Sequence, residues 1–130
     1  MRIAALILAG LAATGCMSRS TSGGDEAGTT ALEISISVKG SERPTKVWTL
    51  RCPDTGTLPD AARACMKLDR LDRPFAPVPK QKACTAIYGG PQVAAVTGTF
   101  KGQPVDARFA RGDGCEIARW NRLAFLFPST

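Results

Sequence analysis

The chain has 130 residues, 44% of them apolar, and its 17 Lys and Arg against 11 Asp and Glu give a formal net charge of +6. This length suits one small domain with extensions. Because histidine is absent, a Ser-His-Asp triad, a Cys-His pair and a His-ligated zinc site are excluded. The five cysteines include no Cys-x-x-Cys pair, so we expect no metal site. Because the histidine base is missing, we also expect no catalytic residue, and we expect no cofactor.

The first fifteen residues have the composition of an export signal. Arg2 gives a positive start, and residues 3–13 form an apolar run that is too short to span a bilayer. Small residues precede Cys16 as in a bacterial lipobox, although Ala13 stands where leucine is usual. We expect a lipoprotein signal over residues 1–15 and an acylated Cys16 that anchors the protein to the cell envelope. Ordinary secretion is the alternative.

Residues 16–30 are rich in Ser, Gly and Thr and have no apolar period, which predicts a flexible linker before a folded domain at 31–130. Outside the cell, disulfides are permitted. The excess positive charge of an exported protein favours anionic envelope polymers or lipid headgroups, and nucleic acid is not expected as a partner. Four arginines near the C-terminus are expected to form a solvated face: Arg108, Arg111, Arg119 and Arg122.

The first elements of the domain are strands. Residues 31–38 alternate between apolar and polar side chains, which predicts a half-buried strand. Residues 45–52 predict a second strand, and the two should pair as an antiparallel hairpin with a longer loop.

A helix is expected next, capped by Thr57 and extending to about Leu71, with one apolar face. Cys65 lies on that face, and Cys52 ends the preceding strand. A bridge between these two cysteines would join the helix to the sheet and stabilise the fold by roughly 3 kcal/mol.

The second half of the domain predicts more strands. Residues 92–100 and 103–111 form two strand-like segments, and residues 123–127 a final, fully apolar strand, while 116–122 could form one or two helical turns. The expected fold is therefore α+β, a mainly antiparallel sheet of about five strands with one main helix packed on it and two disulfides.

The stretch of residues 84–91, Cys-Thr-Ala-Ile-Tyr-Gly-Gly-Pro, is the candidate functional site. An exposed, extended segment has the shape that a protease needs in a substrate, and tethering by a disulfide would make it an inhibitor. Ala86 is small and apolar, which suits subtilisin-like or elastase-like proteases and offers nothing to the acidic pocket of a trypsin-like enzyme. The flanking loop residues are Thr85, Tyr88, Gly89, Gly90 and Pro91.

Several short motifs follow one another in a fixed order across residues 32–127. They are Thr49-Leu50-Arg51-Cys52-Pro53, Gly56-Thr57-Leu58-Pro59, Ala64-Cys65, Cys84-Thr85-x-x-Tyr88, Gly98-x-Phe100-x-Gly102, Phe109, Cys115 and Phe125-x-Phe127. This ordered set resembles the Streptomyces subtilisin inhibitor family. The resemblance implies bridges Cys52–Cys65 and Cys84–Cys115, a five-stranded antiparallel sheet, a homodimer formed through the sheet, and a scissile bond between Ala86 and Ile87.

Two departures from the family pattern fall at the loop. Gly89 and Gly90 stand between Tyr88 and the proline, where one residue is usual. Asp113 replaces an asparagine that supports the loop, and an ionised carboxylate accepts hydrogen bonds but cannot donate them. The leading hypothesis is an inhibitor whose partner is an extracellular serine protease. The alternative is a non-inhibitory envelope lipoprotein that uses the same fold as a binding or structural module.

Overall fold

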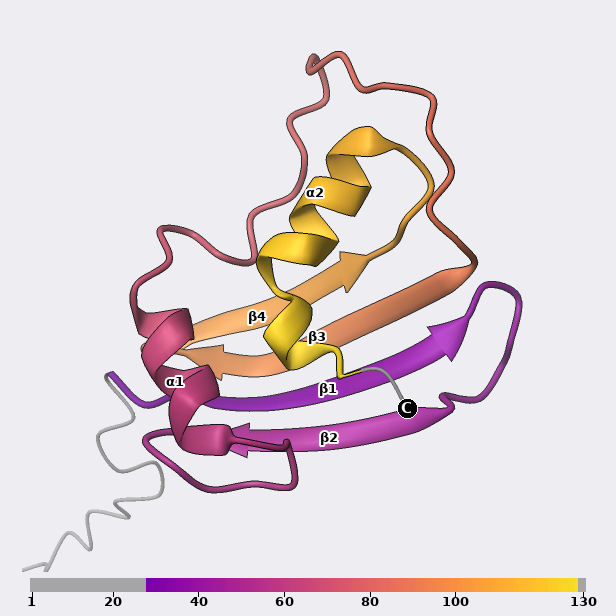
Figure 1. Cartoon of the computed structure of the whole chain (residues 1–130). Coiled ribbons are helices and arrows are strands. Elements are labelled where there is room, and N and C mark those ends of the chain that lie inside the picture. Colours follow the sequence, from indigo (N-terminus) through magenta and orange to yellow (C-terminus); the bar gives the residue numbers. More distant parts are fainter. Residues whose placement is uncertain (1–27, 129–130) are drawn as a thin grey trace, which may run out of the picture.

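Four strands form one antiparallel sheet in the computed structural model, which describes residues 28–128 (Figure 1). Their order across the sheet is β2-β1-β3-β4. The strands are β1 (Ala31–Val38), β2 (Lys46–Arg51), β3 (Gln92–Phe100) and β4 (Gln103–Phe109). The expected signal, Cys16 and residues 16–27 of the expected linker lie outside the described residues.

Alternation along the strands separates the two faces of the sheet. In β1, Leu32 and Ile34 are buried and Glu33 between them is exposed. Two helices, α1 (Ala61–Asp69) and α2 (Gly114–Arg122), lie on the apolar face (Figure 1). The core between sheet and helices includes Leu32, Ile34, Leu50, Cys65, Leu68, Val96, Phe109, Trp120, Leu123, Leu126 and Phe127. Within residues 28–128, no helix covers the opposite face.

The helix α1 confirms the predicted element but not its cap. The Thr57 hydroxyl accepts a hydrogen bond from the Thr49 N–H at 2.9 Å, so this residue supports β2 instead of capping a helix. Asp60 stands at the N-cap with a φ of 54° and makes no side-chain capping bond. The bridge between Cys52 and Cys65 is present and joins the end of β2 to the buried face of α1.

The expected α+β fold with its antiparallel sheet and two disulfides is confirmed, but the C-terminal segment does not form the predicted final strand. Residues 124–126 form a short 3₁₀ helix, η1 (Ala124–Leu126), and α2 is a second full helix. The buried residues of this segment are Leu123, Leu126 and Phe127, whose spacing of three and four follows a helical period. No helix within residues 28–128 is long and apolar enough to cross a membrane.

Candidate functional site

The loop that precedes β3 presents apolar side chains to solvent. Residues 82–90 adopt neither helix nor strand, and Ala86 is exposed. Ile87 is 58% exposed and Tyr88 is 69% exposed, although both are large and apolar. Exposed apolar groups that lie together are typical of a surface that binds another molecule.

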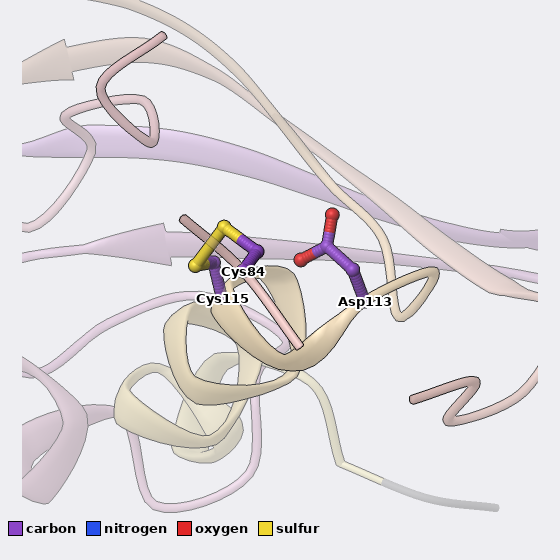
Figure 2. Close-up of side chains that lie close together, drawn as sticks. All are labelled: Cys84, Asp113 and Cys115. Carbon is purple, nitrogen blue, oxygen red and sulfur yellow. A yellow bond between two sulfur atoms is a disulfide. The ribbon is translucent and has the colours of Figure 1, made fainter. Parts of the chain in front are cut away.

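The N-terminal side of this loop is fixed to the start of α2. Cys84 forms a disulfide with Cys115, which confirms the second expected bridge (Figure 2). The Thr85 carbonyl accepts a hydrogen bond from the Gly114 N–H at 2.9 Å. A Cβ atom at position 114 would collide with the Thr85 hydroxyl as it is placed here, so a larger residue would force the Thr85 side chain to rotate.

A tight turn surrounds Ala86. The Ile87 N–H donates a hydrogen bond to the Thr85 carbonyl at 2.9 Å, which closes a three-residue turn centred on Ala86. The sequence predicted a segment that is extended throughout. The turn at Ala86 shows that it is not. The Thr85 carbonyl thus accepts two hydrogen bonds, one from the Ile87 N–H and one from the Gly114 N–H.

The C-terminal side of the loop is held at Gly89. Its N–H donates to the Arg111 carbonyl at 2.7 Å. A Cβ atom at position 89 would lie 2.8 Å from the Ile117 side chain, so the backbone lies directly against α2. Gly90 then has a φ of 127°, which side chains rarely allow. Of the two glycines that depart from the family pattern, Gly89 thus holds this end of the loop against Arg111 and α2, and Gly90 allows the positive φ that follows.

Asp113 acts on the helix and not directly on the loop. Its carboxylate accepts a hydrogen bond from the Glu116 N–H at 2.9 Å and so caps α2. The hydrogen bond to the loop comes from the next residue, Gly114.

Asp113 also lies close to Cys84 and Cys115 (Figure 2). Because these two sulfurs are bonded to each other, they are not thiolates that could hold a metal ion.

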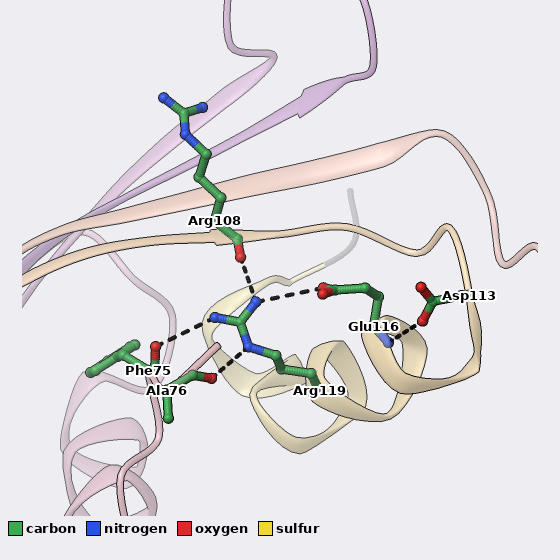
Figure 3. Close-up of polar contacts among 6 residues, drawn as sticks. All are labelled: Phe75, Ala76, Arg108, Asp113, Glu116 and Arg119. Carbon is green, nitrogen blue, oxygen red and sulfur yellow. Dashed lines mark hydrogen bonds and ion pairs between the residues drawn. The ribbon is translucent and has the colours of Figure 1, made fainter. Parts of the chain in front are cut away.

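Arg119 corrects the expectation of a solvated arginine face. Its side chain is 13% exposed and forms an ion pair with Glu116 at 3.5 Å. Its guanidinium also donates to the carbonyls of Ala76 at 2.9 Å, of Phe75 at 3.4 Å, and of Arg108 (Figure 3). Arg119 therefore joins the connector before the loop to β4 and α2.

Two further arginines of that set make contacts within the domain. Arg122 donates to the Asp72 carbonyl at 2.7 Å. The Arg111 guanidinium carbon lies 5.8 Å from the centre of the Trp120 ring. The i,i+3 spacing of Glu116 and Arg119 was a visible signal of an ion pair. The carbonyl groups that accept hydrogen bonds from Arg119 and Arg122 could not be predicted from the sequence, because every residue has a backbone carbonyl.

Comparison with known proteins gives a family match. A family model described as subtilisin inhibitor-like matches residues 28–111, which include the four strands, α1 and the loop. Among solved structures, a similar chain is found in the crystal structure of Streptomyces caespitosus sermetstatin in complex with Bacillus licheniformis subtilisin. It has 23% sequence identity and a TM-score of 0.48, and the match covers 79% of this chain and 100% of that chain. No curated protein sequence matches.

Proposed function

Because this chain belongs to the subtilisin inhibitor-like family, we propose that it inhibits subtilisin-like or elastase-like serine proteases through the loop of residues 84–91. The scissile bond of this loop is Ala86–Ile87. Family membership itself makes the protein an exported protease inhibitor and not an enzyme. The choice of loop, bond and target class is our proposal.

The observation that carries the proposal is that both sides of the loop are held by one short segment, residues 111–115. The disulfide to Cys115 and the hydrogen bond from Gly114 hold one side, and the Arg111 carbonyl holds the other. Between these contacts, three consecutive residues are exposed: Ala86, Ile87 and Tyr88. A loop that is already ordered loses little conformational entropy when a protease binds it.

The same contacts explain how a substrate-like loop could resist turnover. When the protease serine attacks the Ala86 carbonyl, the Ala86–Ile87 bond breaks and the new amine forms on Ile87. The acyl side remains held through Cys84, and the amine side remains held through Gly89. The amine therefore stays close to the acyl-enzyme, and re-formation of the peptide bond competes with release.

Inhibition constants against subtilisin and trypsin test the proposal. We expect the wild type to inhibit subtilisin. Ala86→Lys should weaken inhibition of subtilisin and create inhibition of trypsin, whose specificity pocket holds a carboxylate. Ala86→Pro should abolish both, because proline removes the Ala86 N–H that an extended loop donates to a protease. If the wild type inhibits neither enzyme and Ala86→Lys gains nothing on trypsin, the loop is structural and the alternative of a binding or structural module is favoured.

Anchoring through a lipid on Cys16 is a second part of the proposal. Small residues precede this cysteine and a Ser/Gly/Thr-rich segment follows it, as a tether between membrane and domain requires. We expect Cys16→Ala to move the protein from the membrane fraction to the medium, or to block its processing. Unchanged fractionation together with an unmodified mature N-terminus would contradict lipidation of Cys16 and favour ordinary secretion.

Pairing of two copies through the sheet is the third part. The sheet face opposite the helices carries small side chains at its centre, including Ser35 and Ala95, which are paired positions of β1 and β3. Small residues allow two sheets to approach closely. We expect a dimer in sedimentation velocity, and we expect Ala95→Arg to yield a monomer without loss of protease inhibition. A wild-type monomer at all concentrations would contradict this part.

A further inference from the structure

An open cavity of about 550 Å³ is lined by parts of β1, β3 and β4, by the connection between β1 and β2, and by Glu116 of α2, and residues 84–91 contribute nothing to it. Ser35 and Ser37 of β1 and Ala95 of β3 form its floor. Its walls include Lys39 and Arg43 of the connection between β1 and β2, and Arg108 of β4.

The strand register explains why this part of the face is hollow. Ser35 pairs with Ala95, and Ala95 pairs with Arg108, so the three residues form one row across β1, β3 and β4. Neighbouring strands lie about 4.8 Å apart, so two short side chains leave space beside a long one. Figure 3 shows the Arg108 side chain on the opposite side of β4 from α2.

The charges of the cavity are unbalanced. Lys39, Arg43 and Arg108 form no ion pair with any of residues 28–128, where the ion pairs are Lys101–Asp69 and Arg119–Glu116. Two acidic residues also line the cavity, Glu42 and Glu116. Of these, Glu116 is already paired with Arg119, so three cations face one free carboxylate.

We propose that this cavity binds a phosphate group. Guanidinium groups bind phosphate through two parallel hydrogen bonds, and lysine adds a point charge. The serine hydroxyls of the floor can donate further hydrogen bonds. Three cations from separate segments suit the several oxygens of a phosphate, free or in a diester, better than the two oxygens of a single carboxylate. The group can come from free phosphate or from the headgroup of a membrane lipid.

The first experiment titrates inorganic phosphate into the ¹⁵N-labelled full chain at low ionic strength, with chloride at equal ionic strength as the reference. We expect saturable shifts of the amide signals of Ser35, Ser37, Arg43 and Ala95. Arg108→Gln should weaken binding about fivefold, since it removes one partly screened charge contact but keeps the backbone carbonyl that Arg119 uses. Arg63→Gln on α1 is the matched control, and it should leave binding unchanged.

The second experiment identifies the source of the phosphate. Sedimentation with phosphatidylglycerol vesicles is compared with phosphatidylcholine vesicles for the wild type, Arg108→Gln and Arg63→Gln. Binding that Arg108→Gln lowers and free phosphate competes away indicates a lipid headgroup. If phosphate binding is saturable but Arg108→Gln does not change the amount of protein that sediments with the vesicles, the ligand is free phosphate.

Two results would overturn the proposal. One is that phosphate causes no saturable change beyond that of chloride. The other is that Arg63→Gln weakens binding as much as Arg108→Gln does, because the effect would then come from net charge alone. Since the proposed dimer covers the same face, sedimentation velocity is recorded with and without phosphate on the same samples. Dissociation of the dimer by phosphate, absent in Arg108→Gln, would support the site.

Discussion

The two disulfides have the same chemistry but different surroundings. Cys52–Cys65 separates its cysteines by 13 residues, and Cys65 lies in the core at 7% exposure. Cys84–Cys115 separates its cysteines by 31 residues and lies at the base of the exposed loop. By loop closure alone, Cys52–Cys65 should stabilise the fold by about 3 kcal/mol and Cys84–Cys115 by about 4 kcal/mol. The two bridges differ in the region that each one holds. Cys52–Cys65 fixes the packing of α1, and Cys84–Cys115 fixes the loop of residues 84–91.

This comparison separates stability from inhibition within one small domain. One end of the molecule contains α1 and the other contains the loop, and the sheet is common to both. Different contacts hold α1 and the loop in place. Substitutions at the α1 end should therefore change the free energy of unfolding alone. Those at the loop end should change the inhibition constant as well.

The largest expected effect comes from removing each disulfide in turn. Cys84→Ala with Cys115→Ala should raise the inhibition constant about 100-fold, because about three loop residues must then be ordered on binding, at about 1 kcal/mol each. Cys52→Ala with Cys65→Ala should change it by no more than about twofold at a temperature where the protein is folded. Inhibition assays with subtilisin measure both. Equal losses from the two pairs would refute the separation.

The next effect compares an arginine from each end. Arg119→Gln should lower the free energy of unfolding by about 2 kcal/mol, because charged hydrogen bonds to carbonyls of the connector and of β4 are lost. Arg63→Gln on α1 should change it by less than about 0.5 kcal/mol, since Arg63 is exposed. Urea denaturation measures both values. A loss below 0.5 kcal/mol for Arg119→Gln would show that its contacts add nothing to stability.

Gly89→Ala should weaken inhibition about tenfold, because the methyl group meets Ile117 and displaces the loop from α2. The double variant with Ile117→Ala should recover part of the loss, since space is then available. Gly112→Ala is the matched control, because a Cβ atom there meets nothing within 4 Å. If Gly89→Ala inhibits as well as the wild type, the C-terminal side of the loop does not need this contact.

The smallest effect concerns the cap of α2. Asp113→Ala should lower the free energy of unfolding by about 1 kcal/mol and weaken inhibition slightly, because the helix start holds Thr85 through Gly114. Asp113→Asn should retain both properties, since asparagine caps helices equally well. Thermal unfolding and inhibition assays give the two values. A large loss for Asp113→Asn would mean that the negative charge itself matters.

The strands of the first three-quarters of the chain could be predicted well, because their signals are local. The alternation in residues 31–38 gave the bounds of β1, and residues 92–100 gave those of β3. Residues 123–127 were misassigned because a short, fully apolar run is compatible with a strand or a buried helix. Their helical burial pattern appears only once α2 places them over the core.

The candidate site was predicted in part. The position of the loop and its disulfide followed from the order of cysteines and motifs, and the structure confirms the bridge. The turn at Ala86 and the contact of Gly89 with Arg111 depend on backbone groups, which every residue has and no sequence distinguishes. For the same reason Arg119 was expected in solvent, although three carbonyls surround its guanidinium.

The order of the strands determines what would remain after a cut at Ala86–Ile87. One piece would contain β1, β2 and α1, and the other β3, β4 and α2, so each would have two neighbouring strands and one helix. The boundary between the pieces coincides with the ladder between β1 and β3, which has eight paired positions. The nicked molecule is therefore a bipartite assembly in which two complementary halves share one core, and its only covalent link within residues 28–128 is Cys84–Cys115.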